Sequence, residues 1–196
     1  MVEITSGLDI VNEIVERKSV VAFDSRPIED DKLKALVEAA RWAPSSGNGQ
    51  PWRVTLVRDG LSRADLNEAL APGNQVWAKN APLIVVFASD APNPDRPNSG
   101  AKKMLDVGFA GQNMMLEATH LGLRTHGMGG WDEGKVKSAV GIPDDHNVCF
   151  LLVIGYGGNV DDLPEDVQPK ENRERVRNDV GENFFDDKFG SSWEDR

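Results

Sequence analysis

The stretch APSSGNGQPW, from Ala43 to Trp52, separates a helical pattern from a strand-like one and decides how the chain is organised. Its two prolines and two glycines exclude a regular helix or strand, so we expect a loop. Pro44 ends the preceding helix because it disfavours α geometry at the residue before it. Short polar side chains that can face a planar polar ligand follow it, namely Ser45, Ser46, Asn48 and Gln50. A solvated connector is the alternative that composition alone leaves open.

Two helical patterns precede this loop. In the first, Ser6 can cap a helix whose apolar residues recur at helical spacing, and these are Leu8, Val11, Ile14 and Val15. In the second, Asp30 or Asp31 is the expected cap and a one-sided apolar stripe is expected in the core. The stripe consists of Leu33, Leu36, Val37 and Ala40. Arg41 then faces solvent.

Strands and helices alternate after the loop. Trp52 to Arg58 alternates apolar and polar residues, which is typical of a strand. The continuous apolar runs Leu83 to Ala88 and Val148 to Tyr156 indicate buried strands. Ala101 to Leu121 is helical with apolar residues on several faces, as in a helix buried on both sides. Two short helices complete the pattern, Ser62 to Leu70 and, after a cap at Asp132, Val136 to Val140.

Three further segments are expected to be irregular. Ala71 to Lys79 contains the turn formers proline, glycine and asparagine. Ala91 to Ser99, with three prolines, is predicted to be a flexible loop and a candidate substrate lid. Gly122 to Gly130 is predicted to be a glycine-rich turn that exposes backbone N–H groups.

Composition limits the classes of partner. A chain of 196 residues fits one domain. No apolar run reaches the roughly 18 residues of a membrane helix, and the first residues lack a leader pattern, so we expect a cytoplasmic protein. A net charge of −10 argues against general binding to nucleic acid or anionic membranes. Cys149, the single cysteine, is expected in the core, and the three histidines show no metal-ligand spacing, so we expect no metal.

Three motifs in register resemble those of the flavin-dependent nitroreductase family. The first joins RKSVVAF, Arg17 to Phe23, to the helix end and loop ARWAPSSGNGQPW, Ala40 to Trp52. GLRTHGMGGWD, Gly122 to Asp132, and LVIGYG, Leu152 to Gly157, follow in the family's order and spacing. The resemblance extends over about residues 8 to 175, and the three motifs together are far more specific than any one of them.

The resemblance implies a phosphate site for FMN near the start of the chain. Arg17, Lys18 and Ser19 would hold the phosphate and ribityl chain, and a guanidinium is well suited to bidentate phosphate contacts. Cations that complement a helix C-terminus are the alternative for the first two. Lys170 and Arg173 would close on the same phosphate. Their spacing is one residue longer than is common, so Arg175 can replace Arg173, and a solvated charged helix is the alternative for this segment.

The resemblance also implies contacts to the flavin ring. Backbone N–H groups of Gly129 and Gly130 would lie near N5, where the family often has Glu-Gly. Trp77 and Phe109 would border the substrate space, although a tryptophan folded onto the core fits Trp77 equally well. Asn74 would contact the flavin or its surroundings. From the partner subunit, the ring would be covered by Pro44, Ser45, Ser46 and Asn48.

Val21 departs from the family pattern. Members usually carry Lys or Arg there, aimed at the N1 and O2 edge of the flavin. A charge-assisted hydrogen bond is worth about 1.5 to 3 kcal/mol. Its loss lowers the flavin potential by roughly 30 to 65 mV unless another cation such as Lys18 reaches the same edge.

The implied fold is α+β, with a small mixed central sheet flanked by helices in an intertwined homodimer. Residues 1–160 would form the flavin-binding core. Residues 161–196 would form a C-terminal extension that carries basic FMN-phosphate residues and wraps the partner subunit, with its aromatic side chains over that partner. For the helix of Ala101 to Leu121, a central position in one subunit without a partner is the alternative.

The implied function is an FMN-dependent NAD(P)H oxidoreductase with ping-pong kinetics. NADH or NADPH would pass a hydride to FMN, and a nitroaromatic, quinone or related electron-poor acceptor would then take it. The cofactor carries this chemistry, so no catalytic side chain is required. Two alternatives remain. One is other chemistry of the same family, such as dehalogenation or reduction of enals or semialdehydes, and the other is a flavin-binding protein without turnover.

Overall fold

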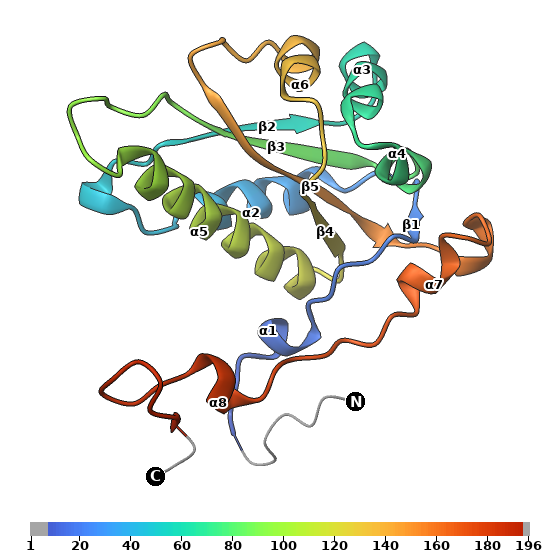
Figure 1. Cartoon of the computed structure of the whole chain (residues 1–196). Coiled ribbons are helices and arrows are strands. Elements are labelled where there is room, and N and C mark those ends of the chain that lie inside the picture. Colours follow the sequence, from blue (N-terminus) through green and yellow to red (C-terminus); the bar gives the residue numbers. More distant parts are fainter. Residues whose placement is uncertain (1–7, 194–196) are drawn as a thin grey trace. The chain divides into compact units, whose positions relative to one another are not determined.

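The computed structural model describes residues 8–193 and shows an α+β fold built on one five-stranded sheet (Figure 1). The strands are β1 (Phe23–Asp24), β2 (Trp52–Val57), β3 (Leu83–Ser89), β4 (Arg124–Met128) and β5 (Asn147–Gly157). Their order is β1-β5-β3-β2, and β4 also pairs with β5. The longest strand, β5, therefore joins the other parts of the sheet.

The α+β class is confirmed, but the strand directions differ from the mixed sheet that we expected. Each pair of named strands is antiparallel. Within residues 8–193, parallel pairing is confined to a single bridge between Ser19 and Thr125. It does not extend because the chain enters β1, which pairs with β5 instead, four residues after Ser19.

Helices cover both faces of the sheet (Figure 1). On one face lie α2 (Asp30–Arg41) and α5 (Ser99–His120), and on the other lie α3 (Leu61–Ala69) and α6 (Glu133–Val140). Side chains of a strand alternate between faces, so Ile84 and Val86 of β3 join one hydrophobic cluster while Leu83 and Val85 join the other. All of β3 is buried, as its continuous apolar run predicts.

The apolar stripe of α2 is narrower than the sequence pattern indicates. Leu33, Leu36 and Ala40 are buried, but 43% of Val37 is exposed. The cap prediction is wrong as well, because Asp30 and Asp31 lie inside the first turn and the N-cap position is taken by Glu29, which makes no side-chain cap bond. Acidic residues in this turn still complement the positive end of the helix dipole.

Three other segments differ from expectation. The segment predicted to be irregular from Ala71 contains helix α4 (Pro72–Ala78), because proline is well tolerated at the first helical position. The glycine-rich segment turns at Gly122, with φ of +74°, and then forms β4. The first helix, α1 (Asn12–Glu16), is shorter than predicted and leaves Leu8 and Val11 exposed, while the Ser6 cap lies outside the described residues.

Helix α6 begins and ends where the sequence predicts. Asp132 Oδ1 accepts a hydrogen bond from the Lys135 N–H at 3.0 Å, which confirms the predicted cap. The helix ends at Gly141, whose φ of +70° favours glycine. Shorter elements are the 3-10 turns η1 (Ser46–Asn48) and η2 (Val160–Asp162) and the helices α7 (Gln168–Glu171) and α8 (Val180–Asn183).

The chain divides into two compact units, which we describe separately. The larger runs from Ile10 to Glu171 and holds the whole sheet. The described part of the smaller unit comprises residues 8–9 and 172–193. In it, Phe185 and Ser192 form an antiparallel bridge, and the rings of Phe185 and Phe189 lie 4.7 Å apart. The predicted division between residues 160 and 161 stays a prediction.

Between residues 8 and 193, no helix is long and apolar enough to cross a membrane.

Candidate cofactor site

The predicted phosphate residues of the N-terminal motif follow α1 directly. Arg17 is the C-cap of this helix and has an extended conformation, with φ of −58° and ψ of 121°. The next residues reach the sheet, where Ser19 bridges Thr125 and the Val20 N–H donates to the Thr125 carbonyl at 3.3 Å. Lys18 and Ser19 are exposed and Arg17 is half-buried. The motif is therefore held beside β4 with polar side chains accessible.

A carboxylate that the sequence analysis missed lies against this segment. Glu171 Oε2 accepts hydrogen bonds from the Val21 N–H at 2.6 Å and from the Ala22 N–H at 2.9 Å. Lys18 Nζ lies 3.9 Å from the other oxygen of Glu171, whose side chain is 11% exposed. Because Glu171 adjoins Lys170 in α7, these contacts bring the predicted C-terminal lysine to the N-terminal motif.

His126 of β4 lies within the same group of charges. Its Nδ1 is 2.8 Å from the Val20 carbonyl oxygen, which can only accept, so Nδ1 carries the hydrogen. Burial lowers the pKa of the imidazole below its ordinary value, and the hydrogen bond to Val20 opposes this. Among the surrounding charges, Glu171 raises the pKa while Lys170 and Arg17 lower it. Arg17 and Lys170 therefore both lie within electrostatic reach of one ring.

The predicted Asn74 and Gly130 also belong to this region. The Ala71 N–H donates to the Gly130 carbonyl at 3.0 Å, which ties the start of α4 to the end of the glycine-rich segment. A Cβ at Gly130 would lie 3.0 Å from the Ala71 Cβ and 3.9 Å from Asn74 Nδ2, so this position suits glycine. At Gly73, a Cβ would lie 4.0 Å from Lys170 Nζ. Asn74 and Lys170 are thus close to the same turn of α4.

Open space adjoins the glycine-rich segment. A Cβ added at Gly127 or at Gly129 would meet no atom within 4 Å, and both residues are exposed. The backbone can therefore be approached closely there by a flat ligand. Gly129 adjoins Gly130, whose added Cβ would lie 3.9 Å from Asn74 Nδ2.

Val21 itself is a core residue, 2% exposed. The charged group nearest to its backbone N–H is the Glu171 carboxylate and not a cation. Lys18 approaches only the far oxygen of that carboxylate. An acid therefore stands beside the position where the family resemblance implies a basic side chain.

The loop that organises the sequence is held by α5. Asp106, 6% exposed, accepts the Ser46 N–H with both carboxylate oxygens at 3.2 Å. Ser45 Oγ accepts the Gln50 N–H at 3.0 Å, and Gln50 Nε2 donates to Asn48 Oδ1 at 3.0 Å. The polar side chains are therefore arranged in advance of any ligand. The signal for Asp106 is an acid on a helix that is otherwise apolar over several faces.

The prediction that Trp77 borders the substrate space is wrong. Only 1% of Trp77 is exposed, and its ring lies 4.5 Å from that of His126 and 6.0 Å from that of Phe23. It sits in the core because α4 continues through it and turns it toward the sheet. Phe109, in contrast, is 40% exposed on α5, and its contact with substrate stays a prediction.

Arg173 and Arg175 belong to the smaller unit, so their part in the phosphate site stays a prediction. The part of the chain that the structure describes contains no group of three or more His, Cys, Asp or Glu residues arranged to hold a metal ion. Cys149 is half-buried, and burial raises the pKa of its thiol.

Comparison with known proteins places this chain. The model of the Nitroreductase family matches residues 14–76 and 71–156. The chain belongs to the nitroreductase family. A relative from Rhodopseudomonas palustris (strain TIE-1), provisionally named an NADH dehydrogenase/NAD(P)H nitroreductase, is 31% identical over 162 residues, which are 73% of this chain and 82% of the relative. An NADH dehydrogenase from Thermus thermophilus is 26% identical over 76% of this chain and 87% of its own length.

Solved structures agree with the nitroreductase fold. A crystal structure of an oxidoreductase containing FMN matches with a TM-score of 0.82 and 28% identity, over 95% of this chain and 96% of the other. A nitroreductase family protein from Clostridium novyi NT has the same fold, with a TM-score of 0.69 and 24% identity over 96% of this chain and 99% of the other. The predicted family is confirmed, and this nitroreductase family member is an oxidoreductase.

Proposed function

We propose that this nitroreductase family member is an FMN-dependent NAD(P)H oxidoreductase that reduces electron-poor acceptors such as nitroaromatics and quinones. One observation carries the proposal: cations from opposite ends of the larger unit, Arg17, Lys18 and Lys170, gather beside Asn74 and the open backbone at Gly129. The FMN content of one similar structure and the NAD(P)H in the names of relatives support the same proposal.

The charges of the site fit a phosphate monoester. Such a group carries about −1.5 to −2 at pH 7, and a protein of net charge −10 needs a local basic cluster to hold it. Three cations supply that cluster, while Glu171 offsets part of their charge. Arg17 offers the planar fork that binds two phosphate oxygens. Ser19 would add a hydroxyl donor, and Arg173 would add a further cation.

The backbone fits the ring. FMN, when bound, supplies the hydride chemistry, so the protein has to position and polarise it. Backbone N–H groups at Gly129 and Gly130 would orient the flavin near N5. A side chain at Gly130 would crowd Ala71, so glycine is favoured there and the backbone stays accessible to a ligand. We assign no acid, base or nucleophile to the protein.

A second copy of the chain would complete the site. The outer face of α5 exposes large apolar side chains, with Leu105 56% and Phe109 40% accessible, and Trp42 is 74% accessible. Exposed apolar surface of this kind indicates an interface. Asp106, which belongs to the same helix, accepts a hydrogen bond from the Ser46 N–H and so holds the loop. We therefore propose a homodimer in which Pro44, Ser45, Ser46 and Asn48 of one subunit cover the flavin of the other.

The decisive test is a visible spectrum of the purified protein, followed by anaerobic titration with NADH and then NADPH. We expect a yellow protein that bleaches with at least one donor and regains colour with a quinone or nitroarene. A yellow protein that ignores both donors would show a flavin binder without turnover. A colourless protein that takes up no FMN would contradict both.

The phosphate cluster is tested by Arg17→Gln/Lys170→Gln. Losing two charge-assisted contacts of about 1.5 kcal/mol each should weaken FMN binding on the order of 100-fold. Riboflavin, which lacks the phosphate, should bind wild type and variant alike. The matched control Lys79→Gln/Lys135→Gln removes two exposed lysines elsewhere and should leave FMN affinity unchanged. Equal losses for FMN and riboflavin would mean that the pair has a structural role instead.

A further inference from the structure

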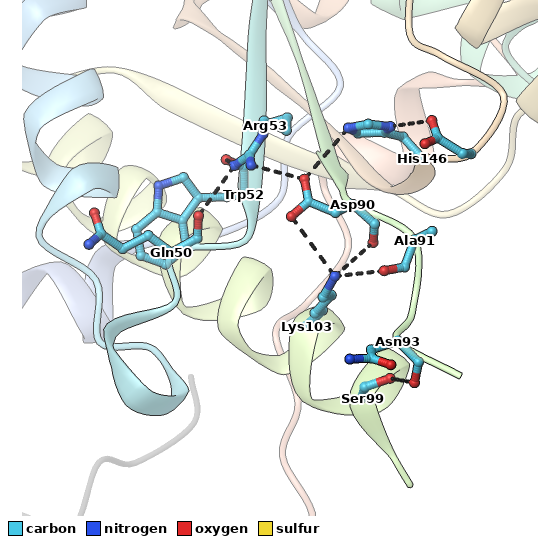
Figure 2. Close-up of polar contacts among 10 residues, drawn as sticks. Gln50, Trp52, Arg53, Asp90, Ala91, Asn93, Ser99, Lys103 and His146 are labelled. Atoms are coloured by element: carbon cyan, nitrogen blue, oxygen red, sulfur yellow. Dashed lines mark hydrogen bonds and ion pairs between the residues drawn. The ribbon is translucent and has the colours of Figure 1, made fainter. Parts of the chain in front are cut away.

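A cavity lies at the start of α5, and its lining includes none of the cations Arg17, Lys18 and Lys170. It has a volume of 320 Å³ and lies between the Ser46 loop, the end of β3 and the proline-rich loop of residues 91–99. Figure 2 shows the polar contacts of its wall. Its charged lining residues are Asp90, Arg96, Lys102, Lys103 and Asp106.

Both acids of this cavity are engaged in internal contacts. Asp90 Oδ1 lies 2.9 Å from Arg53 Nη2 and 3.5 Å from His146 Nε2, and Oδ2 lies 3.9 Å from Lys103 Nζ (Figure 2). Asp106 has both oxygens on the Ser46 N–H. Asp90 is therefore paired with cations, whereas Asp106 is hydrogen-bonded and keeps its negative charge.

One cation of the cavity, Lys103, is held by contacts within the protein. Lys103 Nζ donates to the Ala91 carbonyl at 2.6 Å as well as pairing with Asp90 (Figure 2). Ser99 Oγ donates to the Asn93 carbonyl at 2.9 Å, which ties the same loop to the first turn of α5. The wall is thus built from internal contacts and does not need a ligand to form.

The other two cations are uncommitted. Arg96 and Lys102 are exposed, line the cavity, and make no side-chain hydrogen bond or ion pair within residues 8–193. With the arginine and lysine on Asp90 counted, four cations stand against two carboxylates, which leaves a formal charge of +2 at the cavity.

We propose that this cavity binds the 2′-phosphate of NADPH and makes NADPH the preferred donor, an inference that rests on the proposed function. Two cations match a phosphate monoester, which carries about −1.5 to −2 at pH 7, better than a carboxylate. NADH and NADPH share their diphosphate, so the 2′-phosphate is the group that separates them. A volume of 320 Å³ is at the lower end of small-molecule sites, about 300 to 1,000 Å³, and therefore fits one end of a dinucleotide.

Binding to the FMN-loaded protein tests the site directly. By calorimetry, 2′,5′-ADP should bind at least about tenfold more tightly than 5′-AMP, since one charge-assisted contact is worth that much. Arg96→Gln/Lys102→Gln should abolish the difference, and the control Lys79→Gln/Lys135→Gln should keep it. Competition by inorganic phosphate at the same concentration as 2′,5′-ADP would reveal a general anion site and overturn the donor assignment.

Donor kinetics test the same inference in turnover. Arg96→Gln/Lys102→Gln should raise KM for NADPH about tenfold and leave KM for NADH within about twofold, with FMN content unchanged. Equal effects on both donors, or a loss of FMN affinity, would overturn the inference while leaving the proposed function intact. Failure of the wild type to bind FMN would contradict the proposed function instead, and the comparison of 2′,5′-ADP with 5′-AMP would still decide the cavity.

Discussion

Single residues set the charge beside the candidate flavin site. A buried valine stands where the family pattern favours a cation, and the neighbouring backbone N–H groups are held by Glu171. The electrostatic energy of a charge near the ring depends on its sign. Negative charge at this position makes the electron-rich reduced flavin less favourable. This chain should therefore hold a flavin of lower potential than relatives with a basic residue.

The charge of Glu171 can be removed without removing its acceptor. In FMN-loaded protein, Glu171→Gln should raise the flavin midpoint potential by roughly 30 mV, which is 1.4 kcal/mol for a two-electron couple. The free energy of unfolding should fall by about 1 kcal/mol, because a charged acceptor becomes neutral. Dye-equilibrated reduction and urea unfolding measure the two effects. The exposed Glu165→Gln is the control, and an unchanged potential with reduced stability would make Glu171 a purely structural residue.

At the scale of elements, the residue pattern predicted those helices and strands whose structure depends on nearby residues in the sequence. The buried strand β3, the strand β2 and the cap of α6 all appear in the structure as predicted. Strand β4 was not predicted because its sequence, RTHGM, lacks the apolar pattern of a strand. Its extended structure depends instead on pairing with β5. Glu171 was missed for a similar reason, since its hydrogen-bond partner Val21 is 150 residues away. Local sequence carries no signal for contacts of that range.

Close packing between α5 and the sheet depends on one glycine. A Cβ at Gly111 would lie 2.1 Å from Phe150 Cζ, so Gly111→Ala should destabilise the protein by about 1 to 3 kcal/mol through overpacking. Gly108 on the same helix has nothing within 4 Å of a Cβ, and Gly108→Ala should stabilise by about 0.5 to 1 kcal/mol. Thermal unfolding of both variants measures the contrast. Equal effects would mean that the Phe150 ring moves aside freely.

The contact of α1 with α5 should depend on pH. A hydrogen bond of 2.8 Å to Glu13 raises the pKa of His120, with the charges of Glu117 and Glu13 adding to it, and the same bond lowers the pKa of Glu13. The histidine contribution is lost as pH rises through its raised pKa, and the glutamate contribution as pH falls through its lowered pKa. The pair is therefore complete between about pH 4.5 and 6.5.

Replacing the histidine isolates this effect. His120→Gln should reduce stability more at about pH 5.5 than at about pH 8.5, as measured by urea unfolding at each pH. His146→Gln, at the other end of the unit's described sheet, provides a comparison histidine with a different acidic partner. A difference between wild type and His120→Gln that does not change with pH would contradict the assignment.

At the scale of the whole molecule, α5 divides its two faces between two tasks. One face packs on the sheet through Val107, Ala110 and Met114, and the opposite face exposes Leu105 and Phe109. A helix that is apolar all round is normally covered on both sides. The expectation of a partner follows from this face, and the same helix also holds the Ser46 loop.

Charged side chains on the exposed face of α5 should dissociate the proposed dimer. We expect Leu105→Glu/Phe109→Glu to convert a dimer into monomers in light scattering coupled to gel filtration, since a charge buried without a partner is costly. FMN content should fall with it, because in the proposed dimer the covering loop would come from the other subunit. Leu61→Glu, at an exposed leucine of α3, is the control and should stay dimeric. Monomeric wild-type protein with a full complement of FMN would contradict this arrangement.

The central place of β5 governs the order in which the nascent chain can acquire its shape. The antiparallel pair of β2 and β3 is available once residue 89 has left the ribosome, but β1 and β4 bond to β5 and not to each other. Both must therefore wait for residues 147–157, more than a hundred residues after β1 was made. Pairing over such a separation is slow. Interrupted synthesis before that point leaves strand edges bare, so truncated products should be aggregation-prone and dependent on chaperones.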